Sequence, residues 1–305
     1  MFPKFLQAGS NIGITASARK ISHTELQAAT QWLQQQGYNV TIGNNIGLAD
    51  NQFAGTDAQR LTDLQTMLNN PTLDAIWIAR GGYGTARIID NLDYTQFIKH
   101  PKWIIGFSDI TVLLNDIYSK TNIATIHAIM TTQIATNTSN SLQSLANLLA
   151  GNLPTYTVPY HPLNKTGNAK GVLIGGNLSV LCNSIGTKTD IDTTNKLLLL
   201  EDLDEYLYHI DRLMLHLDRA GKLANLAGLL VGSLTDMKDN EIPFGKAAEE
   251  IVHHYAAKYN YPIAFGVPIG HITDNRAIII GAETQLVVDN NQTKLLVCVD
   301  TSNGA

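Results

Sequence analysis

The stretch from Lys102 to Tyr118, KWIIGFSDITVLLNDIY, changes its hydrophobic period halfway along. Its first part is a short, continuous apolar run, which predicts a buried strand. Its second part repeats apolar residues at the three-to-four spacing of a helix face. Those residues are Ile110, Leu113, Leu114 and Ile117. Ser108 lies between the two parts, so the chain is expected to turn sharply from a strand into a helix at a serine.

A serine at such a turn has its hydroxyl at the carboxyl end of the strand. The amide of Asp109 is free to donate a hydrogen bond, because it belongs to the first turn of the helix. These are the requirements of a nucleophile elbow. The best-known elbow has glycine two residues before and two residues after the serine; Gly106 satisfies the first position and Ile110 breaks the second. A plain helix cap is the alternative role for Ser108.

The first half of the chain alternates predicted strands with predicted helices. The strands are expected at 11–15, 38–42, 74–79, 103–107 and 123–127, with helices at 22–36 and 56–69. Thr56 and Gln59 form a possible capping box for the second helix. This α/β alternation predicts a parallel sheet with helices on both faces. Sites in such sheets lie at the carboxyl ends of the strands, where both Ser108 and the loop at Gly81 are expected.

The second half is predicted to be a smaller, mixed α/β domain. Its strands are expected at 196–200, 226–231, 277–288 and 293–299, and its helices at 206–222 and 244–258. The segment 151–170 is rich in proline and glycine and lacks a helical period, which predicts a linker. A chain of 305 residues is long enough for two domains. We therefore expect an N-terminal α/β domain at 1–150 with the elbow and a C-terminal domain at 171–305.

Composition argues against several classes of function. The net charge of −5 and the lack of a long Lys/Arg run argue against a nucleic-acid binder. No apolar signal segment and no run of 18 apolar residues occurs, so we expect a cytoplasmic protein that does not enter a membrane. Cys182 and Cys298 are far apart and are expected to be buried thiols. No metal-binding motif such as HExxH is present, so neither a metal nor another cofactor is expected.

A catalytic serine needs a base, usually a histidine that is oriented by a carboxylate. Among the nine histidines, His271 stands out because it lies in the loop GHITDN, where no periodic face explains it. Glu201 stands out because LLLLED places a carboxylate at the end of a strongly apolar strand. A solvated strand end is the alternative for Glu201.

Several spaced segments, in the right order, resemble the L,D-carboxypeptidase family of serine peptidases, which includes the self-immunity hydrolases that inactivate microcin C. The segments are GSNIGITASA, ARGGYGTARIID, IIGFSDITVLL, GGNLSVL, LLLEDLDEYLYHIDRLMLHL and GVPIGHITDN. The resemblance implies a catalytic triad of Ser108, Glu201 and His271. It also implies an oxyanion hole made by the backbone amides of Asp109 and Gly81, with Gly82 as the neighbouring candidate.

The resemblance further implies a cytoplasmic homodimer that needs no cofactor and removes the terminal D-alanine from murein tetrapeptides during peptidoglycan recycling. Its site is expected to assemble between the two domains, because the serine belongs to the first and the other two triad residues to the second. Two departures from the family pattern, at Ser17 and around Tyr206-Leu207, concern the expected shape of the substrate loop and leave the triad intact.

An exopeptidase needs hydrogen-bond donors for the free carboxylate of its substrate, and a guanidinium suits that task. Arg80, Arg87 and Arg212 are the candidates. Gly82 and Tyr83, in the loop after the predicted strand 74–79, are expected to contact the substrate as well.

Three alternatives stay open. A microcin-type immunity hydrolase would use the same triad on a peptidyl or aminoacyl-adenylate. The segment Gly82-Tyr83-Gly84 could belong to a nucleotide-phosphate loop, although Arg87 replaces the third glycine of the GxGxxG pattern. A two-domain protein that only binds a small ligand would explain a linker and a crevice. It would not explain a serine elbow, a strand-end glutamate and a loop histidine in one family pattern.

Overall fold

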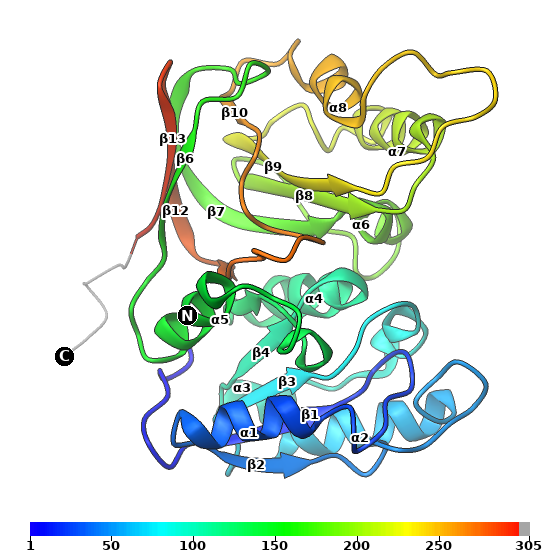
Figure 1. Ribbon diagram of the computed structural model, residues 1–305, viewed down its shortest axis with the longest axis vertical. Helices are drawn as coiled ribbons and strands as arrows, with labels where there is room; N and C mark the ends of the chain where they lie inside the picture. Colours follow the sequence, from blue (N-terminus) through cyan, green and yellow to red (C-terminus); the bar gives the residue numbers. More distant parts are fainter. Residues whose placement is uncertain (299–305) are drawn as a thin grey trace.

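The computed structural model describes residues 1–298, which form two β-sheets with their covering helices. The N-terminal half forms one sheet with its helices and the C-terminal half the other, and helix α4 (Thr111–Thr121) lies between them (Figure 1). The predicted ends of the last strand and of the second domain, at 299 and 305, fall outside the described residues. Within residues 1–298 no helix is long and apolar enough to cross a membrane.

The first sheet has six strands in the order β11-β5-β4-β3-β1-β2, and β1 to β5 run parallel. These strands are β1 (Asn11–Thr15), β2 (Asn39–Ile42), β3 (Ala75–Ile78), β4 (Trp103–Gly106), β5 (Thr125–His127) and β11 (Ile278–Ile280). The accompanying helices are α1 (Gln27–Gln35), α2 (Asp57–Asn69), α3 (Thr95–Lys99), α4 and α5 (Ser139–Leu149). Short 3₁₀ turns are η1 (Thr85–Arg87), η2 (Ile89–Asn91), η3 (Ser108–Ile110) and η4 (Thr131–Gln133).

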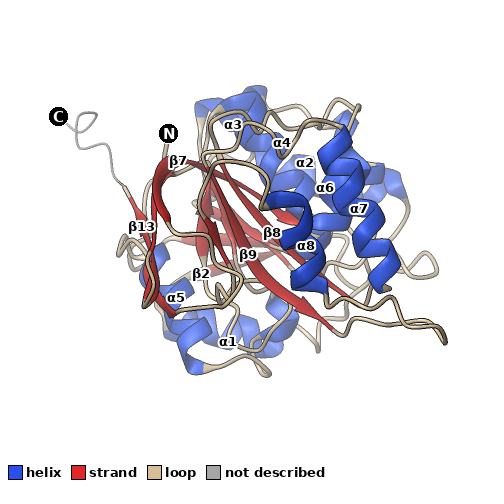
Figure 2. Ribbon diagram, turned by 90° about the horizontal axis from the view of Figure 1, so that it is seen from above, coloured by secondary structure: helices blue, strands red, loops and turns tan. Residues whose placement is uncertain are grey.

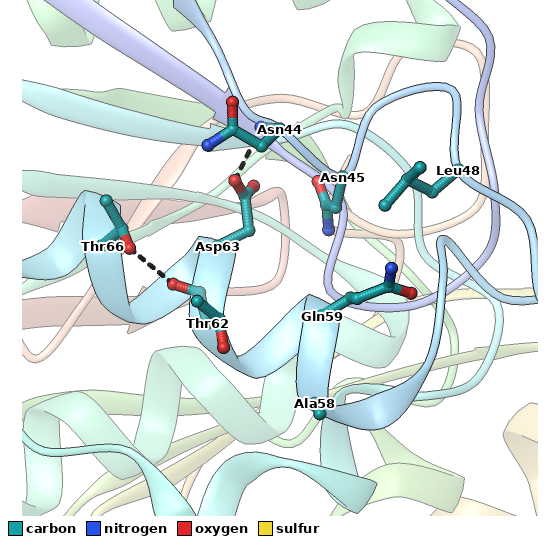
Figure 3. A pocket seen from close by; sticks show the side chains of 8 residues that line it. All are labelled: Asn44, Asn45, Leu48, Ala58, Gln59, Thr62, Asp63 and Thr66. Atoms are coloured by element: carbon teal, nitrogen blue, oxygen red, sulfur yellow. Dashed lines mark hydrogen bonds between the residues drawn. The ribbon is translucent and has the colours of Figure 1, made fainter.

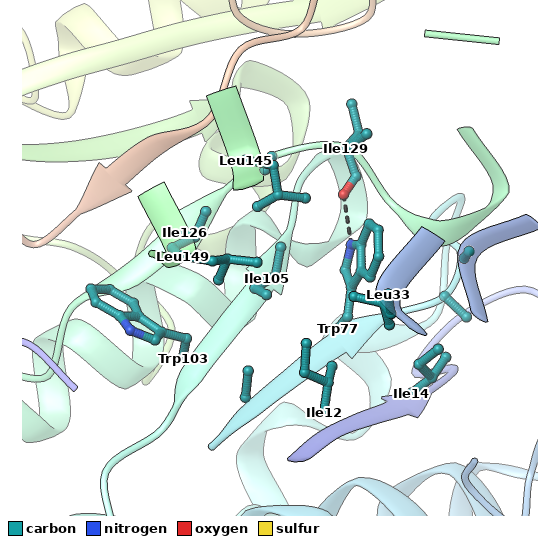
Figure 4. Close-up of a cluster of buried hydrophobic side chains, with 14 of the residues drawn as sticks. Ile12, Ile14, Leu33, Trp77, Trp103, Ile105, Ile126, Ile129, Leu145 and Leu149 are labelled. Carbon is teal, nitrogen blue, oxygen red and sulfur yellow. Dashed lines mark hydrogen bonds between the residues drawn. The ribbon is translucent and has the colours of Figure 1, made fainter. Parts of the chain in front are cut away.

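Helices cover both faces of this sheet, which confirms the predicted α/β class. Helices α1 and α5 pack on one face and α2, α3 and α4 on the other. Figure 4 shows the first of these cores, in which Trp77 and Trp103 are fully buried. The indole N–H of Trp77 donates to the carbonyl of Ile129 at 2.8 Å, so the large ring is buried without an unpaired donor.

The second sheet has seven strands in the order β10-β9-β8-β7-β12-β13-β6. They are β6 (Thr155–Pro159), β7 (Gly167–Asn177), β8 (Leu197–Leu203), β9 (Gly228–Thr235), β10 (Ile263–Ala264), β12 (Glu283–Val288) and β13 (Gln292–Val297). Helices α6 (Leu178–Ser184), α7 (Leu207–Arg219) and α8 (Ala248–Ala256) pack together on one face (Figure 2). The strands from β10 to β7 are parallel and the others antiparallel, so this half is mixed, as predicted.

Local capping signals are confirmed, while some helix limits are not. The capping box of α2 is present: Thr56 N–H donates to Gln59 Oε1 at 2.9 Å, and Gln59 N–H donates to Thr56 Oγ1 at 3.3 Å. Helix α1 begins at Gln27 and not at the predicted Ser22. The reason is local, because the backbone N–H and the hydroxyl of Ser22 both donate to the Glu25 carboxylate and form a separate turn.

The predicted linker at 151–170 contains regular structure. Thr155–Pro159 forms β6, which pairs with β13, and β7 already begins at Gly167. Tyr156 and Val158 point inward, as the period of a strand requires. The Tyr156 hydroxyl donates to the carbonyl of Ala277. This segment is therefore an edge strand of the second sheet, and the domain boundaries at 150 and 171 stay a prediction.

The predicted strand 277–288 is wrong, because it divides between the two sheets. Its first part is β11, which pairs antiparallel with β5, and its second part is β12, which pairs with β7. Gly281 stands at the division with φ +85°, and a Cβ there would lie 2.3 Å from the ring of Tyr118. The C-terminal half thus contributes an edge strand to the N-terminal sheet.

A cavity of about 340 Å³ opens beside α2 (Figure 3). The buried acidic group of the cavity is Asp63. The carboxylate oxygens of Asp63 accept hydrogen bonds from the Thr15 hydroxyl at 2.6 Å and from the backbone N–H of Asn44 at 2.7 Å. None of the predicted catalytic residues lines it. The carboxylate of this cavity is already partnered, so we place the candidate site elsewhere.

Candidate active site

Ser108 lies at the turn between β4 and α4, as predicted. Its φ of +63° is in the left-handed region, which is uncommon for a residue with a side chain and marks a strained turn. A Cβ on Gly106 would lie 2.9 Å from Ile110 Cγ2. Ile110 therefore packs over the glycine that precedes the serine, which explains how this elbow forms without a second glycine.

The side chain of Ser108 does not cap a helix. No side-chain capping bond is present at η3 or at α4, and the serine hydroxyl instead lies 3.0 Å from Nε2 of His271. The two residues are 163 positions apart in the sequence. The cap alternative is therefore not supported.

Three predicted residues meet in one hydrogen-bonded line. His271 Nε2 is 3.0 Å from Ser108 Oγ, and His271 Nδ1 is 2.6 Å from Glu201 Oε2. Glu201 is fully buried, while 13% of the His271 side chain is exposed. Burial raises the pKa of the Glu201 carboxyl, and the hydrogen bond and charge of His271 offset part of that rise. The arrangement has the geometry of a serine–histidine–acid triad.

Glu201 and His271 are brought together by a glycine. Glu201 lies in β8, and His271 lies in the loop between β10 and β11. A Cβ on Gly270 would lie 2.8 Å from Glu201 Cβ and 2.5 Å from Ser233 Oγ, so only glycine lets the loop approach β8 this closely. The Gly270 N–H donates to Asn275 Oδ1 at 3.0 Å, which holds the loop in place.

We expect Gly270→Ala to lower kcat/KM at least about 10²-fold, because a shift of about 1 Å in the loop misplaces the imidazole. Gly266→Ala is the matched control: Gly266 has φ +74° with no atom within 4 Å of its Cβ position, so only backbone strain of about 1–2 kcal/mol applies. Steady-state kinetics and urea unfolding of both variants measure the two effects. Equal losses of activity would contradict the role assigned to Gly270.

Buried polar contacts join the two halves of the site. The side-chain amide of Asn115 in α4 donates to the carbonyl of Gly175 at 3.0 Å and accepts from its N–H at 2.9 Å. The Thr111 hydroxyl accepts from the Asn177 N–H at 3.0 Å, and the Asn177 side chain donates to Asp202 at 2.9 Å. Helix α4, which follows the serine, is thus tied through β7 to the residue after Glu201. The site assembles between the two sheets.

The loop after β3 faces the serine. A Cβ on Gly81 would lie 3.5 Å from Ser108 Cβ. Within residues 1–298, neither the Gly81 N–H nor the Asp109 N–H donates to a protein acceptor. Two free amides beside a serine hydroxyl are what an oxyanion hole requires.

Buried charged groups hold this loop in shape. The Asp109 carboxylate accepts from the Thr85 N–H at 2.9 Å, and the buried Arg60 guanidinium donates to the carbonyl of Gly84 at 2.8 Å. Ser17, which departs from the family pattern, has its hydroxyl 2.7 Å from the hydroxyl of Thr85. Burial raises the pKa of Asp109, and the Thr85 hydrogen bond opposes that rise. Only short 3₁₀ turns follow Gly84, so the loop lacks the helix of a nucleotide-phosphate loop.

The predicted carboxylate-binding arginines are spread over the surface. Arg80 lies 3.3 Å from Glu25, and Arg87 makes a forked ion pair with Asp57. Arg212 is on α7, with its guanidinium 5.5 Å from the ring centre of Tyr208. Their role, and that of Gly82 and Tyr83, stays a prediction.

Two neighbours of the site were missed by sequence reasoning. Arg19 is exposed, has no ion pair among residues 1–298, and lies against Gly82: a Cβ there would be 2.5 Å from Arg19 Cδ. His127 is fully buried at the end of β5, with Nε2 4.0 Å from Glu201 Oε1. Arg19 follows the predicted strand 11–15, and His127 is the last residue of the predicted strand 123–127. Their position at the carboxyl edge of the sheet, where sites of such folds lie, could have indicated both residues.

Across residues 1–298, no three His, Cys, Asp or Glu side chains group closely enough to hold a metal ion. Cys182 is buried as predicted, whereas Cys298 is only half-buried.

Comparison with known proteins identifies relatives over most of the chain. The family model for the LD-carboxypeptidase N-terminal domain matches residues 12–128, and that for the LD-carboxypeptidase C-terminal domain matches residues 170–286. A probable murein peptide carboxypeptidase of Bacillus subtilis is 34% identical, over 93% of this chain and 91% of the relative. A murein tetrapeptide carboxypeptidase of Pseudomonas aeruginosa is 30% identical, over 87% and 89%.

Solved structures have the same fold. A muramoyltetrapeptide carboxypeptidase from Oxalobacter formigenes superposes with a TM-score of 0.86 at 24% identity, over 95% of this chain and 99% of that one. The microcin C7 self immunity protein MccF, in complex with aspartyl sulfamoyl adenosine, has a TM-score of 0.86 at 20% identity, over 98% and 99%. Two matching family models, two relatives at 30% identity or more and a shared fold lead to one conclusion: the chain belongs to the LD-carboxypeptidase family.

Proposed function

We propose that the protein is a serine carboxypeptidase that releases the terminal D-alanine from murein tetrapeptides in peptidoglycan recycling. The observation that carries the proposal is the line of hydrogen bonds from Glu201 through His271 to Ser108, beside two free backbone amides. The names of the relatives from Bacillus subtilis and Pseudomonas aeruginosa support the substrate class.

The chemistry follows from the order of the three groups. Ser108 Oγ attacks the carbonyl carbon at the L-centre of the diamino acid, and His271 Nε2 takes the hydroxyl proton. Glu201 keeps the imidazole in the tautomer with hydrogen on Nδ1 and stabilises the imidazolium. His271 then gives the proton to the nitrogen of D-alanine as the C–N bond breaks. Water, deprotonated by His271, releases the acyl group and restores the serine.

The negative oxygen of the tetrahedral intermediate would lie between the amides of Gly81 and Asp109. One such donor is typically worth about 10²–10³ in rate. Because the Asp109 carboxylate binds the Thr85 amide, the same residue would shape the loop with its side chain and bind the oxyanion with its backbone.

Arg19 is the cation best placed for the free carboxylate of D-alanine. Its side chain covers Gly82, next to Gly81, and its charge has no ion-pair partner among the described residues, whereas Arg80 is already beside Glu25. A guanidinium binds a carboxylate with two parallel hydrogen bonds. The terminal carboxylate is only a few bonds from the scissile carbonyl, so the geometry suits an exopeptidase.

We expect Arg19→Ala to raise KM for the tetrapeptide about 10- to 100-fold, since a hydrogen bond to a charged group is lost. KM for the C-terminally amidated peptide should change little. Arg219→Ala is the control, because Arg219 is exposed at the end of α7 and is not a candidate for the carboxylate. Steady-state kinetics on both peptides decides the matter: equal effects of Arg19→Ala on the acid and the amide would remove Arg19 from the carboxylate site.

The proposal includes a homodimer, which the family resemblance suggests, in the cytoplasm. Light scattering of the purified protein measures the number of chains in a particle, and cell fractionation measures the compartment. A monomer at working concentration, or a secreted protein, would contradict these two parts without affecting the chemistry.

The deciding experiment is mass spectrometry of L-Ala-γ-D-Glu-meso-diaminopimelate-D-Ala incubated with the protein. Loss of one terminal D-alanine supports the proposal. An intact tetrapeptide together with cleavage of an aminoacyl sulfamoyl or adenylate substrate would favour an immunity hydrolase, since the structural neighbour MccF is a self immunity protein solved with aspartyl sulfamoyl adenosine. Binding of either compound without turnover would favour a protein that only binds a small ligand.

A further inference from the structure

The carboxylate of the triad and a buried histidine next to it face each other without a hydrogen bond. Glu201 is fully buried, and its Oε1 has no partner among the described residues, since only Oε2 contacts His271. His127 is also fully buried, and neither of its ring nitrogens has a partner there. His127 Nε2 is 4.0 Å from Glu201 Oε1. Buried groups of this kind are normally paired, because an unpaired one costs about 1–3 kcal/mol.

His127 cannot replace His271 as the base. The rings of both histidines contact Phe107, with centroid distances of 5.5 Å for His127 and 4.7 Å for His271, and only His271 lies against Ser108. Burial, with a smaller contribution from the charge of His271, lowers the pKa of His127 to about 3. The ring is therefore neutral at physiological pH and carries one N–H, which can be donated from one nitrogen.

We propose that His127 is a positioning residue that donates its Nε2–H to Oε1 of Glu201 while Oε2 holds His271. The contact closes from 4.0 Å by a small rotation of either side chain, at the stage when His271 becomes an imidazolium and the carboxylate must remain an anion. A second donor on the carboxylate then fixes its orientation and stabilises its charge. This inference rests on the proposed function and adds a residue to its machinery.

The other groups around Glu201 are accounted for. His271 comes from the loop before β11, Asp202 from the same strand and Asn177 from β7. The hydroxyl of Ser233, in β9, is buried and also without a partner. Asn177 donates to Asp202, and its side chain also acts on Glu201, whose pKa burial raises and this contact lowers. The amide nitrogen of Asn275 is buried without a partner, while its Oδ1 accepts from the Gly270 N–H. His127, in β5, and Ser233, in β9, are the two unpartnered strand donors that the variants below compare.

Four variants separate these donors. The amide nitrogen of glutamine reaches the position of Nε2, whereas that of asparagine reaches the position of Nδ1. We therefore expect His127→Asn and His127→Leu to lower kcat about 10- to 100-fold with little change in KM, and His127→Gln to keep most of the activity. Ser233→Ala should keep the kcat of the wild type. Thermal unfolding of each variant establishes that it is folded.

The pH profile gives a readout that a purely structural role would not move. Loss of a donor to the carboxylate favours protonated Glu201, which cannot orient His271, so the acidic limb of kcat/KM should shift to higher pH in His127→Asn and His127→Leu. His127→Gln should keep the limb of the wild type. If His127→Leu does not fold, the comparison of His127→Gln with His127→Asn still tests the role of His127.

A fluorophosphonate probe that acylates activated serines separates failure of this inference from failure of the proposed function. Its reaction rate, followed by intact mass, needs an activated Ser108 but no murein peptide. A wild type that reacts with the probe and leaves the tetrapeptide intact contradicts the substrate, and the four variants are then compared by labelling rate. Equal labelling of His127→Asn, His127→Gln and wild type overturns the role of His127. An effect of Ser233→Ala as large as that of His127→Asn overturns it too, and a wild type that is not labelled overturns both proposals.

Discussion

Ser108→Ala is expected to lower kcat/KM for the murein tetrapeptide by about 10⁴–10⁶, the range found when the nucleophile of a triad is removed. Among the described residues, the substitution removes the only hydroxyl within hydrogen-bond distance of His271 Nε2, so the nucleophile that attacks the carbonyl is lost. The free energy of unfolding should change by no more than about 1 kcal/mol, because only one hydrogen bond is lost and the backbone strain at φ +63° remains.

Release of D-alanine, followed by mass spectrometry under single-turnover conditions, measures the effect of Ser108→Ala. Ser119→Ala is the control, since Ser119 is an exposed serine of the same helix α4 and should leave both activity and stability unchanged. Activity of Ser108→Ala close to that of the wild type would refute the elbow and, with it, the serine mechanism.

Glu201→Gln should lower kcat by about 10³–10⁴ while the fold is retained. The amide can present its NH₂ group to His271 and so favour the wrong imidazole tautomer, which is the effect that an acid-to-amide change has on a triad. The carboxylate of Glu201 is fully buried and accepts one hydrogen bond, from His271, so the neutral amide avoids the desolvation of a charge. We therefore expect kcat to fall while the free energy of unfolding rises.

The pH dependence of stability tests the same substitution. Burial raises the folded-state pKa of Glu201 above its unfolded value. The wild type therefore loses stability as pH rises through the folded-state pKa, because the folded state binds more protons in that window. Glu201→Gln lacks this loss, so its stability relative to the wild type should improve as pH rises from the unfolded-state pKa, about 4.3, through the folded-state pKa.

Urea unfolding at several pH values measures this difference. Glu241→Gln is the control, because Glu241 is exposed and should show neither the loss of kcat nor the trend with pH. A variant that becomes steadily less stable than the wild type as pH rises would contradict the raised pKa of Glu201.

Local signals in the sequence were sufficient where short-range physics decides the structure. The change of period at Ser108, the capping box at Thr56 and the alternation of the first half each depend on neighbours within a few residues. The grouping of Ser108 with His271 and Glu201 did not follow from local signals. It came from the resemblance to a family, since spacing alone left a helix cap and a solvated strand end as alternatives.

Long-range packing decided what local patterns could not. Residues 278–280 look like the start of one long strand, yet they pair with β5 in the N-terminal sheet, and the chain turns at Gly281, where the ring of Tyr118 leaves room only for a glycine. Residues 155–159 have two prolines nearby and look like a linker, yet they form an edge strand against β13. In both places the partner strand lies far away in the sequence.

The amino-acid sequence was sufficient to predict the fold class and the elbow and to propose Ser108, Glu201 and His271 as the triad, because periodicity, turn chemistry and family motifs are all present in the chain as written. Only the tertiary structure decided that Gly270 lets His271 reach Glu201, that α4 is bonded to β7, and that Arg19 and His127 border the site. These features depend on contacts between residues sixty or more positions apart, or on the space that is free between packed elements. Such distances follow from the packing of the whole chain and not from any one segment of it.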